Sequence, residues 1–248
     1  MAALDPEPWE ALLPIAGRPM LAYVVEALLA SGVVHAVRVV GPPVPGGFPM
    51  AAPRTVDTLA PRETLWENLD LGLAAVDRAQ PALVVTGDIP LLTGDAVRAF
   101  VEAAESADRA AGGADIVYPL VPRAVVEQAY PEVHRTYFRL REGVFTGGNV
   151  FWVRPAALSG LRDRAEQLLA HRKSPAKLAG DIGWGVLARY VLRRLSLGDV
   201  ERVAGRLLAV RGLGLVFAHA EVGVDVDKPS DLELVRRHLA AGTAVRGA

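Results

Sequence analysis

The sequence has no cysteine, and this absence excludes disulfide bonds, thiolate metal sites and a cysteine nucleophile. An excess of charge is also missing, because 27 basic residues face 28 acidic ones and leave a formal net charge of −1. Such a balance gives no general attraction to nucleic acid or to an anionic membrane. No apolar run approaches the roughly 18 residues of a membrane span, and the first residues lack the basic and apolar regions of a signal peptide. We therefore expect a cytoplasmic protein without nucleic-acid or membrane partners.

Several catalytic motifs are missing as well. The sequence contains no G-x-S-x-G, no Walker A and no G-x-G-x-x-G pattern, so a hydrolase or a P-loop protein has no support. His134 and His171 have no partner at metal-ligand spacing, and we expect them to be solvated or locally hydrogen-bonded rather than zinc ligands. What remains is a chain of 248 residues, 51% hydrophobic and 22% charged, which is ample for a folded core.

The first half of the chain alternates helical and extended patterns. Apolar residues recur at helical spacing over 21–29, 65–76 and 97–104. Between them, short apolar runs at 37–40 and 83–86 predict buried strands. This order of helix and strand is typical of a doubly wound α/β fold with a mostly parallel sheet.

The second half adds further strands and a helical block. Strands are predicted at 115–121, 135–141, 143–145, 148–153, 213–218 and 222–226. The segment at about 155–206 has few strand signals, so it predicts a helical subdomain with a surface that could serve a homodimer. A terminal helix begins at Lys228-Pro229. We find no internal repeat and expect a single domain over 1–248.

Asp88 is the central residue of the candidate site. It directly follows the strand predicted at 83–86, after Gly87 has freed the backbone and before Pro90 blocks a helix. Open α/β sheets bind their ligands beyond the carboxyl ends of the strands, so a carboxylate at this point predicts a metal-anchoring acid. Mg²⁺ prefers one or two carboxylates together with substrate phosphates, and Asp88 therefore needs a partner acid.

Asp225 and Asp227 supply the best partner acids. On an extended backbone the two side chains point to the same face, because side chains alternate with a period of two. For each residue a second interpretation has at least equal weight. Asp227 precedes Lys228-Pro229 and suits a helix N-cap, while Asp225 suits an exposed strand position.

The segment from Phe145 to Asn149 is the other distinctive motif. Gly147 and Gly148 would let the backbone approach a ligand closely, and the Asn149 amide can both donate and accept hydrogen bonds. A hairpin turn with Asn and Gly in left-handed conformations is equally compatible with this pattern.

Arginines precede this motif at alternating positions. Arg135, Arg139 and Arg141, with Tyr137 between them, would share one face of a strand. That face could bind phosphate groups bidentately, or it could be the solvated face of an edge strand, which is the commoner case.

Four segments in this order resemble the nucleoside-triphosphate transferase superfamily with the GT-A-like fold, and most closely the branch of molybdenum-cofactor guanylyltransferase. They are 14–21, 86–90, 145–149 and 223–232. The resemblance implies a three-layer α/β/α, Rossmann-like domain with a mixed, mostly parallel sheet and a helical C-terminal insertion. It also implies that a nucleoside triphosphate and a small phosphorylated or hydroxylated acceptor react with release of pyrophosphate.

The resemblance further implies a role for individual residues. Mg²⁺ would be held by Asp88 and Asp227, with Asp225 as a neighbour, and Asp88, Asp227 and Arg18 would be catalytic. The expected nucleotide- or substrate-binding residues are Gly87, Arg62, Arg139, Thr146, Gly147, Gly148 and Asn149.

This sequence departs from the family pattern in two places. The usual first strand and its phosphate-binding, Gly-rich loop are missing from the sequence, and we expect a groove beside the Asp88 strand. Glu10 stands where the family usually has a lysine, so the compensating cation would come from Arg18, Arg62 or an arginine within 135–141. Besides the transferase, two alternatives remain: a nucleotide- or metabolite-binding protein without transfer chemistry, and a sugar-nucleotide glycosyltransferase.

Overall fold

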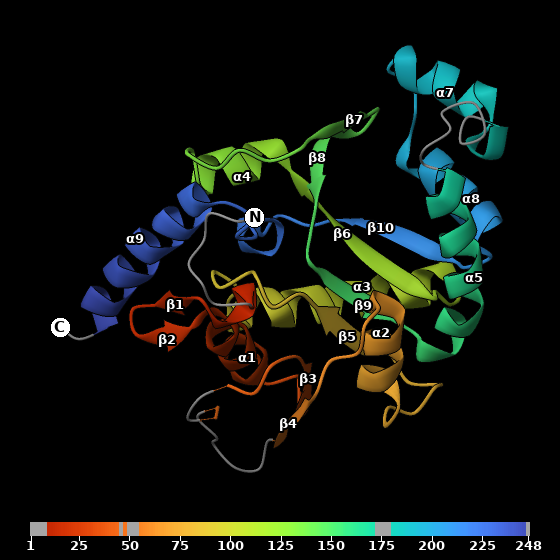
Figure 1. The fold of residues 1–248 in the computed structure, drawn as a ribbon. Coiled ribbons are helices and arrows are strands. Elements are labelled where there is room, and N and C mark those ends of the chain that lie inside the picture. The colour runs from red at the N-terminus through yellow and green to blue at the C-terminus, as the bar shows by residue number, and fades with distance from the viewer. Residues whose placement is uncertain (1–8, 45–46, 49–54, 172–179, 247–248) are drawn as a thin grey trace.

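The computed structural model describes residues 9–44, 47–48, 55–171 and 180–246 (Figure 1). Its helices are α1 (Met20–Ala30), α2 (Leu65–Leu73), α3 (Gly94–Ala111), α4 (Arg123–Ala129), α5 (Pro155–His171), α7 (Trp184–Val191), α8 (Leu197–Leu208) and α9 (Pro229–Arg246), with 3-10 turns η1 (Glu10–Leu12) and η2 (Ala220–Gly223). Its strands are β1 (Pro14–Ile15), β2 (Arg18–Pro19), β3 (Ala36–Val40), β4 (Thr55–Leu59), β5 (Ala82–Val85), β6 (Ile116–Pro122), β7 (Phe138–Leu140), β8 (Gly143–Gly147), β9 (Val150–Val153) and β10 (Gly212–Val216). Among the described helices, none combines the length and the apolar character that crossing a membrane requires.

The main sheet has six strands in the order β5-β9-β6-β8-β7, and β10 pairs with the other edge of β6. The pairings make β5, β6, β7 and β10 run in one direction and β8 and β9 in the opposite direction. The expected mixed sheet is therefore confirmed, but the expectation of mostly parallel pairing is wrong, although four of the six strands share one direction. Most of its ladders are nevertheless antiparallel, because the two reversed strands lie between strands of the other direction.

Helices cover both faces of this sheet. On β10, Leu213 and Leu215 pack against the core cluster that contains Phe100 of α3, whereas a methyl group on Gly214 would meet Leu197 of α8. Successive strand residues face opposite sides, so α3 and α8 lie on opposite faces. The three-layer α/β/α arrangement is confirmed.

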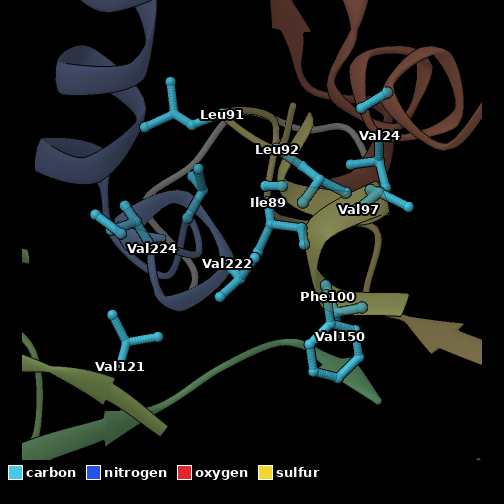
Figure 2. Close-up of a cluster of buried hydrophobic side chains, with 14 of the residues drawn as sticks. Val24, Ile89, Leu91, Leu92, Val97, Phe100, Val121, Val150, Val222 and Val224 are labelled. Atoms are coloured by element: carbon cyan, nitrogen blue, oxygen red, sulfur yellow. The ribbon is translucent and has the colours of Figure 1, made fainter. Parts of the chain in front are cut away.

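The main core joins segments that are far apart in the sequence. Figure 2 shows Ile89, which follows β5, among Phe100 of α3, Val150 of β9 and Val222 of η2. These side chains are fully buried, and the Phe100 ring contacts Phe217 edge to face at a centroid distance of 5.5 Å. Packing at this point fixes the residues after β5 against those around η2.

A small second sheet lies beside the main one. β3 pairs with β4 in parallel, and α1 bridges the two sheets because its Val25 packs with Val39 of β3 while its Val24 joins the main core. In the part of the chain that the structure describes, β5 pairs only with β9 and β3 only with β4. No described strand fills the position beside β5 that we expected to be open.

Two predicted strands were wrong in part. The strand expected at 222–226 is η2 followed by an extended segment, in which Val226 N donates a hydrogen bond to Asp88 O at 2.9 Å without a regular ladder. The side chains of this segment still alternate between buried and less buried positions as expected, since Val222, Val224 and Val226 are fully buried. The strand expected at 135–141 is limited to β7, because Arg135 is engaged elsewhere, as described below.

Candidate active site

Asp88 lies three residues beyond the end of β5 and is fixed at two points. Its carboxylate accepts a hydrogen bond of 2.5 Å from the Thr86 hydroxyl, and its carbonyl oxygen accepts the bond from Val226 N. The first bond orients the side chain, and the second attaches its backbone to the segment before α9. No role was expected for the Thr86 side chain, although its spacing of two from Asp88 in a turn was a usable signal.

The structure brings Asp88, Asp225 and Asp227 together. One carboxylate oxygen from each residue lies within 4.8 Å of the others. Asp88 and Asp225 are half-buried and Asp227 is exposed. Burial of the neighbouring valines on the opposite face of the extended segment turns both C-terminal aspartates toward Asp88, as the period of two predicts.

If Asp227 were the N-cap of α9, its side chain would accept a hydrogen bond from the backbone of the first helical turn. Among the described contacts its carboxylate accepts no such bond. At the start of α9 it is the Asp231 carboxylate that accepts hydrogen bonds, from Asp227 N at 3.2 Å and from Lys228 N at 3.1 Å. The carboxylate of Asp227 is therefore available to the acidic cluster.

Asn149 connects the two acid-bearing segments. Its backbone N–H donates to Val222 O at 2.8 Å, its side-chain amide donates to the same oxygen at 3.4 Å, and its carbonyl oxygen accepts from Thr86 N at 3.1 Å. The residue thus joins the end of β5 to η2. These hydrogen bonds give Asn149 a structural role in holding the two segments together. Binding of a nucleotide by Asn149 stays a prediction.

Gly147 and Gly148 let their backbone lie close to the side chains of other residues of the protein. A methyl group on Gly147 would overlap the Tyr118 hydroxyl, and one on Gly148 would lie 2.7 Å from a Pro119 side-chain carbon. Neither glycine has a positive φ, so the left-handed hairpin turn was the wrong alternative. Thr146 is buried beside Gly223, with its methyl carbon 3.3 Å from the place of a Gly223 side chain. Here too, contact with a ligand stays a prediction.

The arginines assigned to the site lie in different surroundings. Arg18 forms an ion pair with Glu26 at 2.6 Å and covers the Tyr23 ring at 4.6 Å. Arg139 is exposed on β7, at the end of the sheet order, which matches the solvated edge-strand interpretation. The described contacts give neither arginine a bond to the acidic cluster.

Arg62 and Gly87 lie on the η1 side of β5. Arg62 precedes α2 and lines a hollow of about 490 Å³ together with Trp9, Glu63 and Glu67. A methyl group on Gly87 would lie 3.6 Å from Ala11 of η1, so the chain passes η1 closely at this glycine. An aromatic ring beside a guanidinium suits a nucleotide base and phosphate, and the role of Arg62 in binding stays a prediction.

Arg135 is the cation that the structure places at the cluster. Its guanidinium forms an ion pair with Asp225 through Nη1 and Oδ1. Ninety residues separate the two partners in the sequence, and no spacing rule links them. The arginine was expected on a strand face shared with Arg139 and Arg141, either phosphate-binding or solvated, but Arg135 and Arg141 lie outside β7, so the shared face is absent.

The donor set of the cluster fits a hard divalent cation. Three carboxylates offer oxygen ligands within one coordination sphere's reach, and oxygen is what Mg²⁺ accepts from proteins. Thr86 restrains the Asp88 carboxylate in the way that outer hydrogen bonds orient metal ligands. Asp88 and Asp227 have no cation partner among their described contacts, unlike Asp225.

Comparison with known proteins agrees with this architecture. Residues 8–180 match the family described as the MobA-like NTP transferase domain. A solved structure titled as a hypothetical transferase from Thermus thermophilus is 43% identical, with a TM-score of 0.76 and coverage of 90% of both chains. No curated protein matches.

More distant structures share the fold. A 4-diphosphocytidyl-2C-methyl-D-erythritol synthase is 17% identical with a TM-score of 0.54, covering 93% of this chain and 94% of its own. A CMP:2-keto-3-deoxy-manno-octonic acid synthetase complexed with CTP is 18% identical with a TM-score of 0.52, covering 95% and 93%. The family match includes Asp88 and ends before Asp225 and Asp227, the partner acids expected from the sequence, which the structure brings next to Asp88. With a match over more than half of its length and the nucleotidyltransferase fold, the chain belongs to the MobA-like NTP transferase family.

Proposed function

We propose that the protein is a Mg²⁺-dependent nucleotidyltransferase that transfers a nucleoside monophosphate from a nucleoside triphosphate to a small phosphorylated or hydroxylated acceptor. The observation that carries this proposal is the cluster of Asp88, Asp225 and Asp227 at the end of β5. Ligand sites of open α/β sheets lie beyond the carboxyl ends of the strands, and the family of the chain uses nucleoside triphosphates.

In the proposed reaction an acceptor oxygen forms a bond to the α-phosphorus, and the bond to the oxygen bridging the α- and β-phosphates breaks. Pyrophosphate leaves with that bridging oxygen, and the proton of a hydroxyl acceptor passes to solvent. Bound Mg²⁺ would offset the negative charge that develops on the phosphates. Asp88 and Asp227 would hold the ion, and Thr86 keeps Asp88 aligned. The protein's contribution is chiefly positioning and electrostatics.

A second candidate is a nucleotide-binding protein of the same family without transfer chemistry. The observation that favours it is that two of the positions expected to supply a cation do not offer a free one, because Arg18 is paired with Glu26 and Glu10 stands where the family usually has a lysine. Incubation with each of the four ribonucleoside triphosphates, Mg²⁺ and candidate acceptors separates the two. Release of pyrophosphate supports the transferase, whereas saturable binding of a nucleotide without release supports the second candidate.

Substitution of Asp88 tests the role of the cluster. We expect Asp88→Asn to lower pyrophosphate release by roughly 100-fold or more, because one anchoring charge is lost while the side chain keeps its shape. The far-ultraviolet circular dichroism spectrum should not change. Asp163→Asn, at an exposed position of α5, is the matched control and should keep full activity. Unchanged activity of the Asp88 variant would remove this residue from the mechanism.

A further inference from the structure

Arg135 is more enclosed than a surface arginine. It lies in the loop between α4 and β7, and 15% of its side chain is exposed, against 14% for its partner Asp225. In the part of the chain that the structure describes, Arg135 Nε and Asp225 Oδ1 are both buried without a hydrogen-bond partner, so the ion pair is the contact that joins the two groups. The contact with Asp225 is therefore an ion pair with limited help from water, in which each charge depends on the other.

Two tyrosines mark the surroundings of the guanidinium. Burial raises the pKa of Tyr118, and the charge of Arg135 opposes this shift. Burial also raises the pKa of Tyr137, where Arg135 again acts in the opposite direction. Tyr118 stacks on Phe151 at 5.3 Å, and Arg123 covers the Tyr137 ring at 5.4 Å. Arg135 therefore lies close enough to both tyrosines for its charge to act on their hydroxyl groups.

The charges of the site can be counted. Asp88, Asp225 and Asp227 contribute −3 when ionised, and Arg135 contributes +1. The sum, −3 + 1 = −2, equals the charge that one divalent cation neutralises. Without Arg135 the same pocket would hold three carboxylates within 4.8 Å of one another and an excess of one negative charge.

We propose that Arg135 sets the charge of the metal site by neutralising Asp225, so that Asp88 and Asp227 bind the ion and Asp225 is held by the protein. This inference rests on the proposed function, since it concerns the metal site proposed there. Arg135 is a positioning residue in this scheme. It tunes the affinity for the cation and the preference for divalent over trivalent ions.

In this scheme, substitution of Arg135 should strengthen the binding of a cation rather than weaken it. Removal of a positive charge a few ångströms from a cation site strengthens cation binding, because the repulsion between guanidinium and metal is lost and Asp225 becomes a free ligand. We expect Arg135→Gln to bind Mn²⁺ roughly 10-fold or more tightly than the wild type. The gain should be larger for Tb³⁺, which carries one more charge.

The test is a titration of the full chain with Mn²⁺, followed by electron paramagnetic resonance, and with Tb³⁺, followed by luminescence. Asp225→Asn should bind Mn²⁺ more weakly than the wild type, and Arg135→Gln/Asp225→Asn should return to within about 3-fold of it because the two charge changes cancel. Arg135→Lys keeps the charge and should stay near the wild type. Arg109→Gln, on the exposed surface of α3, controls for the overall loss of one positive charge.

The outcomes separate this inference from the proposed function. If the wild type binds Mn²⁺ and Arg135→Gln binds it equally or more weakly, the inference about Arg135 is overturned while the metal site stands. If the wild type binds no Mn²⁺ but Arg135→Gln does, the role of Arg135 is supported and the proposed magnesium dependence is lost. If neither binds, both are overturned. The double variant guards against misfolding, since it leaves no unpaired buried charge.

Discussion

Gly147 shows how strictly one position is set by its neighbours. Any side chain there would enter the space that the Tyr118 hydroxyl occupies, across the ladder between β6 and β8. The glycine therefore lets β8 lie against β6 without displacing the Tyr118 ring, whatever ligand the protein binds.

We expect Gly147→Ala to lower the free energy of unfolding by roughly 1–3 kcal/mol, the usual cost of overpacking. Tyr118→Phe removes the oxygen that the new methyl group would meet, so Gly147→Ala/Tyr118→Phe should recover part of the loss. Urea denaturation of the single and double variants measures this coupling.

Gly160→Ala provides the control, because a methyl group at that helical position meets no atom within 4 Å. Its stability should equal or exceed that of the wild type. Simple additivity of the Gly147 and Tyr118 changes would show that the hydroxyl is not the obstacle.

Individual site residues were predictable to different degrees. Asp88 could be found from the sequence, since a strand, a glycine and an acid follow one another directly. Asp225 and Asp227 could be named as candidates but not chosen over their alternatives, because the deciding contacts come from residues far away. The pairing of Arg135 with Asp225 depends wholly on tertiary structure and has no local signal.

At the scale of elements, the sequence predicted a helix or strand correctly where the residues that start and end it lie within or beside it. The helix α3 begins after Thr93, whose side chain accepts a hydrogen bond from Ala96 N as an N-cap should, and it ends at Gly112 in the left-handed conformation. The segment 222–226 was predicted as a strand from its alternation. In the structure no described strand pairs with it in a ladder. Whether such a neighbour is present depends on the tertiary packing of the core and not on the local sequence.

The start of α8 provides a pH test. Ser196 and Asp199 form a capping box, and the Asp199 carboxylate also bonds to Arg189 and Arg202. The hydrogen bond from Arg202, followed by those from Ser196, lowers the pKa of Asp199 to about 2. A lowered pKa means that the ionised form stabilises the folded state. This stabilisation is complete above the ordinary carboxyl pKa of about 4 and is lost as the pH falls toward 2.

We therefore expect Asp199→Asn to unfold at a lower urea concentration than the wild type at pH 7. The difference should shrink between pH 4 and pH 2, as the wild-type carboxylate takes up its proton. Urea titrations across this range measure both variants, with Asp163→Asn of α5 as the reference. A difference that stays constant down to pH 2 would refute the role of the ionised carboxylate.

At the scale of the whole molecule, the main sheet ends at β5 with an edge that is unpaired in the described part of the chain. β9 has hydrogen-bonded neighbours on both sides, β5 and β6, whereas β5 has one. Alternate amides of β5 point away from β9 and have no ladder partner among the described strands.

Hydrogen exchange resolved to single amides should reveal this difference. We expect the outward amides of β5 to exchange at least 10-fold faster than those of β9, since open edges are the less protected part of a sheet. The inward amides of β5 serve as the internal reference. Equal protection of both sets would mean that a further segment pairs with β5.

The distance in sequence between the carboxylates has a consequence for the newly made protein. During synthesis, the ribosome delivers Asp88 and Arg135 long before Asp225 and Asp227 exist, so a nascent chain carries an acid and a base without their later partners. The region matched by the family, 8–180, would be complete at that stage and still unable to assemble the acidic cluster.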